Sequence, residues 1–353
     1  MDAMRAFAAL AVVLTHARDF LMVDYHDTKA WAPFYFLTGL GHQAVIIFFV
    51  LSGFWISRTT LQNLEKPNFW RDYLIARLTR VLIVLVPTLI VGGTLDYFGG
   101  FFFKFPLYYD GSAHSMSPLS PDSLTVLMFL GNLTFLQGLF VSCFGSNGPL
   151  WSLAFEFWFY LWFPSIMLVY RGKLTLFLAA LIIAFIFPLL AVYFIIWAMG
   201  ALAQVGDGRL YYKISFFRLH PKLAQILSLV ILLVSVSFSR LSPGLIADMV
   251  LGICFSAMLT VMLNSDIIFF KPLNLLVTYG RKASYSLYLV HFPILLFGVA
   301  VSGLQRDEPN LLAGVGVLAI AAGIAAIAYC FAMITESRTS ALRAAVLRAW
   351  ARA

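Results

Sequence analysis

Two ionisable side chains interrupt the apolar run that opens the chain, MDAMRAFAALAVVLTHARDF. Arg5 and His16 are eleven positions apart, about three turns of an α-helix, so both would leave the same helix face roughly 16 Å apart along its axis. An ionisable group inside an apolar segment is a functional candidate, and an imidazole that titrates near neutral pH suits a general base. The alternative is that Arg5 anchors a membrane helix and His16 is a satisfied core residue.

A second candidate region is GLGHQAVIIFFVLSGFWISR, residues 39–58. Ser52 and Gly53 form a notch of small residues where another helix or a ligand can approach closely. Helix packing explains this pair as well as ligand binding does. His42, at the outer end of the segment, is expected to be an interfacial residue.

Arg77 and Arg80 lie in NFWRDYLIARLTR, residues 68–80. Their i, i+3 spacing places both on one helix face. Guanidinium groups bind phosphate through two parallel hydrogen bonds, so the pair favours a phosphate-bearing ligand. Ordinary anchoring of a membrane helix by positive charge is the equal alternative.

Glu156 lies deep inside the aromatic run NGPLWSLAFEFWFYLWFP, residues 147–164. A buried carboxylate must be paired, protonated or facing water, so Glu156 is either functional or held by a structural partner. Asp248, near the outer end of its apolar run, is expected to be peripheral. His291, Tyr288 and Trp151 are further candidates for a polar cavity, although the hydroxyl groups of GRKASYSLYLVHFP, residues 280–293, also suit hydrogen bonds between helices.

The composition places these residues in a membrane protein. Of the 353 residues, 61% are hydrophobic and 11% charged, whereas soluble domains have about 25% charged residues. We therefore expect an all-α polytopic membrane protein. No clustered basic face with stacking aromatics is present, which argues against nucleic-acid binding, and the three cysteines lack metal-ligand spacing. The GxSxG, P-loop and HExxH motifs are also absent.

Hydropathy predicts about ten membrane-spanning helices, at residues 4–23, 42–58, 81–98, 150–170, 174–188, 191–205, 223–240, 244–263, 284–304 and 311–334. The runs 174–188 and 191–205 are shorter than the ~17–20 residues of a full span, so either they form a tight hairpin or their predicted ends are wrong. No cleavage site follows 4–23, which predicts a retained helix; the chain opens almost inside it, which suggests a few upstream residues.

The positive-inside rule decides whether 123–142 crosses the membrane. If 123–149 is re-entrant and both termini are cytoplasmic, 19 of the 24 lysines and arginines lie inside, all except Arg18, Lys29, Lys104, Arg240 and Arg306. If 123–142 crosses, only eight remain inside. We therefore predict the re-entrant topology, with a membrane domain at 1–336 and a short basic cytoplasmic tail at 337–353. Irregular backbone at membrane depth lines a cavity or is buried in protein, so this segment indicates a site.

Five motifs in this order resemble acyltransferase family 3, a family of integral-membrane O-acyltransferases: MRAFAALAVVLTH (4–16), FFVLSGF (48–54), RLTR (77–80), WSLAFEFWFY (151–160) and SYSLYLVHFP (284–293). The resemblance covers essentially the whole chain. It implies transfer of an acyl group, usually acetyl, from acyl-CoA to a hydroxyl of a cell-envelope glycan, a lipid-linked sugar or a small secreted molecule. We further expect that the protein lies in a bacterial inner membrane, that it needs no metal and that it can form a homo-oligomer. The lead-in is shorter than expected and no fused periplasmic esterase-like domain is present.

The resemblance assigns roles to residues at the matching positions. Arg5 and His16 match the essential pair of the family, Arg77 and Arg80 its arginine motif, and Glu156 its acidic position. We expect the two arginines of the motif to hold CoA phosphates, with Ser52 and Gly53 also at the donor site. His16 would be the general base, Glu156 its orienting partner and Arg5 a donor-binding or charge-holding group.

Three alternatives stay open. An acyl-histidine intermediate at His16 is one variant of the mechanism. A secondary transporter or glycan exporter would also explain many spans and buried ionisable groups. A catalytically inactive scaffold of the same fold is the third. The acceptor and the length of the acyl group are not predicted.

Overall fold

The computed structural model describes residues 1–26, 29–111, 118–169, 174–205, 220–264 and 274–352. Within these ranges the chain is helical, with two isolated β-bridges and no strand, so the prediction of an all-α protein is confirmed. Most of the cytoplasmic loop predicted at 205–222 lies outside the described residues, as do Arg171 and Lys173. The chain forms two compact units.

The first unit contains Met1–Gly41, Trp70–Ala154 and Leu275–Ala353. Its longer helices are α1 (Asp2–Leu21), α4 (Phe69–Asp96), α14 (Asn274–Ser302), α15 (Leu311–Ile334) and α16 (Thr339–Arg352). Its shorter elements are η1 (Lys29–Trp31), α2 (Ala32–Leu37), the π-helical turn η2 (Tyr97–Phe102), α5 (Leu107–Asp110), η3 (Pro121–Leu124), α6 (Val126–Leu133), η4 (Gly148–Leu150) and η6 (Glu336–Arg338). Of α7 (Trp151–Val169), only the first turn belongs to this unit.

Small residues let α14 approach its neighbours in the first unit. A Cβ added to Gly280 of α14 would lie 2.0 Å from the Asp2 carbonyl oxygen of α1, so only glycine fits where these two helices meet. Further along, a Cβ added to Gly92 of α4 would lie 3.3 Å from Cγ of Pro293 of α14, a tight contact. Close backbone contact of this kind is the usual way helices associate where the hydrophobic effect is weak.

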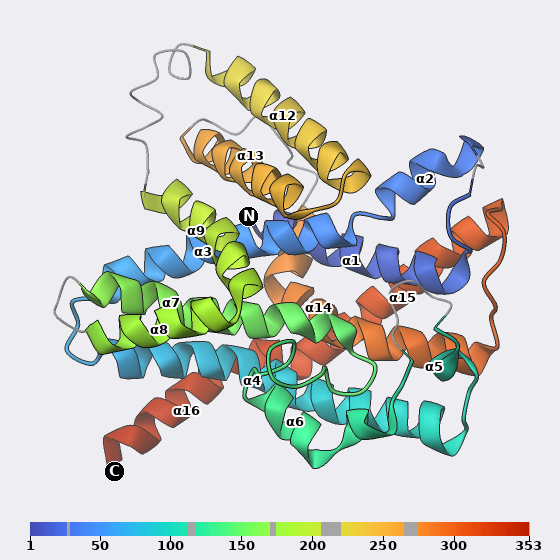
Figure 1. The fold of residues 1–353 in the computed structure, drawn as a ribbon, viewed down its shortest axis with the longest axis horizontal. Coiled ribbons are helices and arrows are strands. Elements are labelled where there is room, and N and C mark those ends of the chain that lie inside the picture. The colour runs from blue at the N-terminus through green and yellow to red at the C-terminus, as the bar shows by residue number, and fades with distance from the viewer. Residues whose placement is uncertain (27–28, 112–117, 170–173, 206–219, 265–273, 353) are drawn as a thin grey trace. The chain divides into compact units, whose positions relative to one another are not determined.

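The second unit contains His42–Phe69 and Phe155–Asn274. Its helices are α3 (Gly41–Asn63), the rest of α7, α8 (Leu174–Ile186), α9 (Pro188–Val205), α12 (Pro221–Leu241) and α13 (Leu245–Leu263). Helices α12 and α13 lie side by side and are joined by a short turn (Figure 1). An aromatic core lies between α7 and α9, where Phe159 packs against Phe194 and Trp197.

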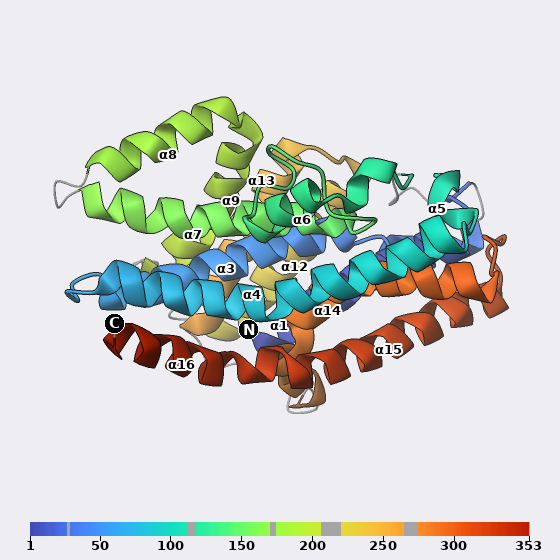
Figure 2. The same cartoon turned by 90° about the horizontal axis from the view of Figure 1, so that it is seen from below.

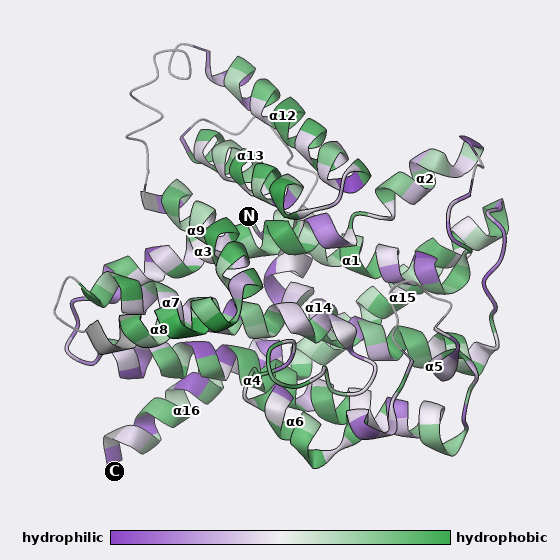
Figure 3. Cartoon of the chain, in the orientation of Figure 1, coloured by the Kyte–Doolittle hydropathy of each residue, from purple (hydrophilic) through white to green (hydrophobic). Residues whose placement is uncertain are grey.

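Seven helices among the described residues are long and apolar enough to cross a membrane, or eight if α8 and α9, bent by 118° at their junction, form one broken span. Most of their residues are hydrophobic (Figure 3), and side chains such as Phe185 and Leu312 are more than 80% exposed, as lipid-facing residues would be. The chain is therefore a polytopic membrane protein. The predicted count of ten is not confirmed. Helix α1 is not among the seven because it carries four charges, Asp2, Arg5, Arg18 and Asp19.

The segment between α4 and α7 falls outside this set of long helices. Between η3 and η4 the chain contains only the eight-residue helix α6, about 12 Å long and too short to cross a bilayer. That agrees with the prediction that 123–142 does not span, while its depth in the membrane stays a prediction. Helix α16 follows α15 after the turn η6 (Figure 2) and carries Arg343, Arg348 and Arg352.

Candidate active site in the first unit

The imidazole rings of His16 and His291 stack on one another where α1 meets α14. Their centroids are 5.2 Å apart and their planes differ by 25°. Phe292 packs edge-on against His16 at 5.1 Å, and Phe20 packs against Phe292. His291 is fully buried, whereas His16 is partly exposed. His16 is thus the ring of the pair that a ligand can reach.

Hydrogen bonding fixes the tautomer of His291. Its Nδ1 lies 2.7 Å from the Tyr288 carbonyl oxygen and 3.1 Å from that of Leu287. Carbonyl oxygens only accept, so Nδ1 carries the hydrogen and the neutral ring has a bare lone pair on Nε2. Among the described residues, neither His291 Nε2 nor His16 Nδ1 has a hydrogen-bond partner, and both atoms are buried. Such groups are rare in folded proteins and call for a functional explanation.

The far end of α1 is tied to the connection between α14 and α15, which keeps the two rings together. Val23 N donates to the Asp307 carbonyl, and Asp307 N donates to that of Leu21. Arg306 reinforces this junction, because it donates to the Met22 carbonyl and pairs with Asp24 at 2.7 Å.

A second clamp holds the same end of α1 to α2. The guanidinium of Arg18 is buried, pairs with Asp19 and donates to the Tyr35 carbonyl at 3.0 Å. Its Cζ also lies 5.3 Å from the centre of the Tyr35 ring.

The segment before α7 is bound to α14 one turn from His291. The Tyr288 hydroxyl lies 2.6 Å from Ser152 Oγ and donates to the Pro149 carbonyl at 3.1 Å. Asn147 Nδ2 donates to the Leu289 carbonyl at 2.9 Å. Trp151 precedes Ser152 at the start of α7 and is partly exposed. The predicted cavity candidates His291 and Tyr288 are therefore brought close to His16.

Buried polar side chains hold the irregular backbone of this segment. Asp96, fully buried at the end of α4, accepts from Ser146 N at 2.6 Å and from Ser146 Oγ at 2.8 Å. Asn132 accepts from Phe144 N and donates to the Ser142 carbonyl, while Gln137 donates to the Leu150 carbonyl. Sequence reasoning missed all three, although isolated amides inside the apolar run 123–142 were an available signal.

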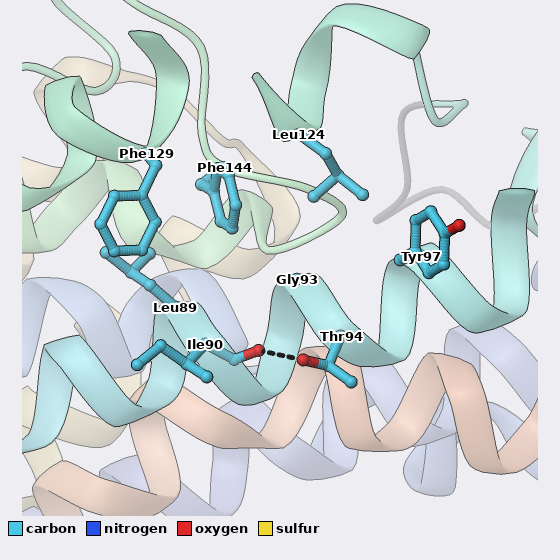
Figure 4. A pocket seen from close by; sticks show the side chains of 8 residues that line it. All are labelled: Leu89, Ile90, Gly93, Thr94, Tyr97, Leu124, Phe129 and Phe144. Atoms are coloured by element: carbon cyan, nitrogen blue, oxygen red, sulfur yellow. Dashed lines mark hydrogen bonds between the residues drawn. The ribbon is translucent and has the colours of Figure 1, made fainter. Parts of the chain in front are cut away.

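An open apolar groove of about 310 Å³ lies between α4 and this segment, and its lining residues are Leu89, Ile90, Gly93, Thr94, Tyr97, Leu124, Phe129 and Phe144 (Figure 4). Nearby, burial raises the pKa of the Cys143 thiol to about 12, against a smaller opposing hydrogen bond from the backbone of Trp151. A thiol that stays protonated at neutral pH is a poor nucleophile, so Cys143 does not compete with the histidines as the reactive group.

The three arginines expected to bind the donor, Arg5, Arg77 and Arg80, belong to the same unit. Arg80 is exposed, and Arg77, partly exposed, has its Cζ 5.3 Å from the centre of the Tyr73 ring. Arg5 is partly exposed and 4.0 Å from Asp2. Arg80, and more weakly Arg5, attract the carboxylate of Glu336, which accepts from Ser286 N and Oγ at 3.2 and 3.0 Å. Glu336 was not among the predicted site residues.

Three predicted site residues belong to the second unit. Ser52 accepts from Trp197 Nε1 at 3.2 Å, and a Cβ added to Gly53 would lie 1.9 Å from the Trp197 carbonyl oxygen. Helix α9 thus occupies the notch, as the packing alternative requires, and a role in donor binding stays a prediction. Glu156 is partly exposed on α7, and its predicted role beside His16 also stays a prediction.

The expectation that Asp248 is peripheral is wrong. Its side chain is only 2% exposed and receives hydrogen bonds from His42, Tyr193 and Ser239. Sequence position near a helix end suggested exposure, but α3, α9 and α12 cover that end. Among the described residues, no group of three or more His, Cys, Asp or Glu side chains could hold a metal ion.

Comparison with known proteins fits these observations. The chain is 30% identical over 164 residues to the acyltransferase MdmB of Streptomyces mycarofaciens, an alignment that covers 46% of this chain and 38% of the relative. It is 26% identical over 360 aligned positions to the peptidoglycan O-acetyltransferase OatA of Listeria monocytogenes, covering 88% of this chain and 51% of OatA. The chain thus spans about half of the length of OatA and 38% of the length of MdmB. No solved structure matches it significantly.

The sequence profile described as "Acyltransferase domain" matches residues 1–334. This range holds the stacked histidines, the segment bound to α14 and both arginines of the RLTR motif. Since the match covers nearly the whole chain, this polytopic membrane protein belongs to the Acyltransferase domain family.

Proposed function

We propose that the protein is a membrane-bound O-acyltransferase that moves an acyl group, acetyl in the first instance, from cytoplasmic acyl-CoA to a hydroxyl of a sugar, a polysaccharide or a lipid-linked acceptor. The observation that carries this proposal is the stacked pair of His16 and His291, with two buried ring nitrogens that have no partner among the described residues. Family membership supports the class of reaction, and the names of the relatives suggest acyl and acetyl transfer.

His16 is the general base in this mechanism. It takes the proton of the acceptor hydroxyl while that oxygen attacks the carbonyl carbon of the thioester; the carbon–sulfur bond then breaks, and the thiolate leaves with the proton from His16 as free CoA thiol. His291 lies behind His16 and stays neutral, because two imidazolium rings 5.2 Å apart would repel each other strongly. The pair therefore holds one extra proton at a time, which is what a single transfer requires.

The donor enters from the side that carries the arginines. Arg80 is exposed and Arg77 partly exposed on one face of α4, and the two side chains are proposed to bind CoA phosphates. Arg5, on α1 with His16, contributes positive charge along the same route. Glu336, close enough to Arg80 and Arg5 to attract them, balances this charge before the donor binds.

Glu156 is proposed to orient or charge-stabilise the imidazole of His16. The membrane is proposed to be the bacterial inner membrane, with both termini in the cytoplasm, which places the arginines of α4 on the side where acyl-CoA occurs. The acceptor is then presented from the opposite side, and assembly into a homo-oligomer is compatible with this arrangement.

The test is release of free CoA thiol by the purified protein in lipid nanodiscs, supplied with acetyl-CoA and a cell-envelope glycan extract. His16→Ala should lower turnover by roughly 100-fold or more, and Arg5→Lys should also lose acyl transfer, while both variants stay folded by circular dichroism. Ser302→Ala, at the far end of α14, is the matched control, since its hydroxyl bonds only within its own helix. Wild-type turnover in His16→Ala would rule out the assignment.

A secondary transporter or glycan exporter is the second candidate, and the 118° bend between α8 and α9 is the observation that favours it, because broken helices line transport sites. A transporter would move a glycan across a vesicle membrane without consuming acetyl-CoA. An acyltransferase would release CoA thiol in proportion to acylated product. Measuring both quantities in the same proteoliposomes separates the two functions.

A further inference from the structure

A second histidine site, distinct from the stacked pair, lies within the second unit. His42, the second residue of α3, places Nε2 2.9 Å from both carboxylate oxygens of Asp248 in the first turn of α13. The carboxylate only accepts, so Nε2 carries the hydrogen and Nδ1 of the neutral ring has a bare lone pair. The Asp248 side chain is 3% exposed but that of His42 is 42% exposed, so a buried carboxylate group holds an accessible imidazole.

Four helices build the support behind His42. Tyr193 of α9 donates its hydroxyl to Asp248 Oδ2 at 3.4 Å, and Ser239 of α12 donates to Oδ1 at 3.5 Å. Gln43 of α3 donates from Nε2 to Ser239 Oγ at 3.1 Å. Held by these hydrogen bonds, the Asp248 carboxylate fixes the orientation of the His42 ring.

One member of this cluster has an unused acceptor. Gln43 is 3% exposed, and within the described chain its Oε1 has no hydrogen-bond partner. Together with Nδ1 of His42, the cluster therefore presents acceptors that need hydrogens from elsewhere. A ligand with several hydroxyl groups supplies them, whereas an anion would be repelled by Asp248.

We propose that His42, oriented by Asp248, and Gln43 form a binding site for the hydroxyl groups of a neutral sugar, the acceptor of the acyl group. This inference rests on the proposed acyl transfer and adds the place where the acceptor is recognised. His42 acts here as a specificity residue that accepts a hydrogen bond, and Asp248 is its positioning residue. In the predicted topology α3 begins at the outer face, where a cell-envelope sugar is presented.

The kinetic test compares His42→Gln with His42→Leu in the nanodisc assay. Glutamine keeps a donor for Asp248 and an acceptor for the ligand, whereas leucine supplies neither. His42→Leu should raise KM for the glycan extract about 10-fold, the equivalent of one to two hydrogen bonds, with KM for acetyl-CoA unchanged; His42→Gln should restore KM to within about threefold. A loss confined to kcat, or equal losses in the two variants, would overturn the proposal.

A second measurement uses the unmodified protein and does not need turnover. Diethyl pyrocarbonate attacks bare imidazole nitrogens, so mass spectrometry of the His42 peptide reports access to Nδ1. A saturating neutral fraction of the glycan extract should slow this modification at least threefold, and trimethylamine N-oxide at equal osmolality, which has no hydroxyl groups, should not. Absence of protection by the glycan would overturn the site.

Matched variants separate recognition from packing. Ser239 and Ser235 are buried hydroxyls one turn apart on α12, but only Ser239 bonds to Asp248 and Gln43. Ser239→Ala should raise the acceptor KM and Ser235→Ala should not; equal effects would indicate a structural role alone. If the wild type released no CoA thiol but the glycan still protected His42, the proposed acyl transfer would be wrong and the proposed sugar site would be supported.

Discussion

The two units hold histidines in opposite ways. In the first unit His16 and His291 are stacked, and their buried nitrogens Nδ1 and Nε2, respectively, lack partners within the described chain. In the second unit the Nε2 atom of His42 is hydrogen-bonded to a buried carboxylate. A ring bonded to a carboxylate keeps one orientation and one tautomer, whereas no hydrogen bond among the described residues fixes the tautomer of His16, the ring proposed to carry the proton. The difference suits proton transfer in the first unit and ligand recognition in the second.

The largest expected effect tests whether the stacked rings act as one. We expect His16→Gln and His291→Gln each to lower kcat by roughly 100-fold, and the double variant to lose little more, because residues that act as a unit are not additive. Initial rates of CoA release for the four proteins measure this directly. A double variant whose loss equals the product of the two single losses would show that the rings act independently.

The next prediction compares one buried aspartate in each unit. Asp96 accepts hydrogen bonds from a loop, and Asp248 accepts a hydrogen bond from an imidazole. Asp96→Ala leaves the amide and hydroxyl of Ser146 buried without an acceptor, which should cost about 2–3 kcal/mol of stability and lower activity by loosening the segment bound to α14. Thermal unfolding in detergent micelles measures it.

Asp122→Ala is the control for that measurement, because Asp122 is exposed in the same segment and, within the described part of the chain, no hydrogen bond of its side chain belongs to the loop network. Equal stability of the two alanine variants would contradict the role assigned to Asp96.

A third effect concerns the notch at Ser52 and Gly53. A Cβ at position 53 would overlap the Trp197 carbonyl oxygen, so Gly53→Ala should push α3 from α9 and lower stability by about 1–3 kcal/mol. Gly298→Ala in α14, where a Cβ meets nothing within 4 Å, should be neutral or slightly stabilising. A Gly53→Ala protein that unfolds like the wild type but has a raised KM for acetyl-CoA would instead support donor binding.

Hydropathy predicted most of the helices, because long apolar runs give a strong local signal. The run 81–98 marks only the apolar part of α4, which begins at Phe69 and includes Arg77 and Arg80. That these two arginines lie on a helix was predicted from their i, i+3 spacing and not from hydropathy. The bend between α8 and α9 was anticipated only as a pair of short runs. Pro188, which begins α9, marks that bend in the sequence.

The candidate site was predicted in part. The sequence singled out Arg5, His16 and the motif around His291, whose roles stay predictions. The stacking of His16 on His291 depends on the close approach of α1 and α14 at Gly280, a tertiary contact. The burial of Asp96 and Asp248 escaped prediction for the same reason, because each lies at a helix end that other elements cover. Local sequence shows which groups are polar, while their neighbours decide whether those groups are exposed.

The smallest effect concerns the junction that holds α1 to the α14–α15 connection. A hydrogen bond with the Asp24 backbone, and then the charge of Glu308, raise the pKa of His26 above its ordinary value of 6.5. Since the protonated ring is favoured in the folded protein, its contribution to stability is complete below pH 6.5 and is lost as pH rises through the raised value.

His26→Gln should therefore reduce the fall in thermal midpoint between pH 6 and pH 9, by a small amount because the pair is exposed and screened by solvent. Glu308→Gln should remove part of the same dependence, and Arg306→Gln, which breaks the more shielded pair with Asp24, should lower the midpoint at every pH. If His26→Gln left the pH profile unchanged, the junction would be held by Arg306 and the backbone bonds of Asp307, and the stacked histidines would have no pH-sensitive support.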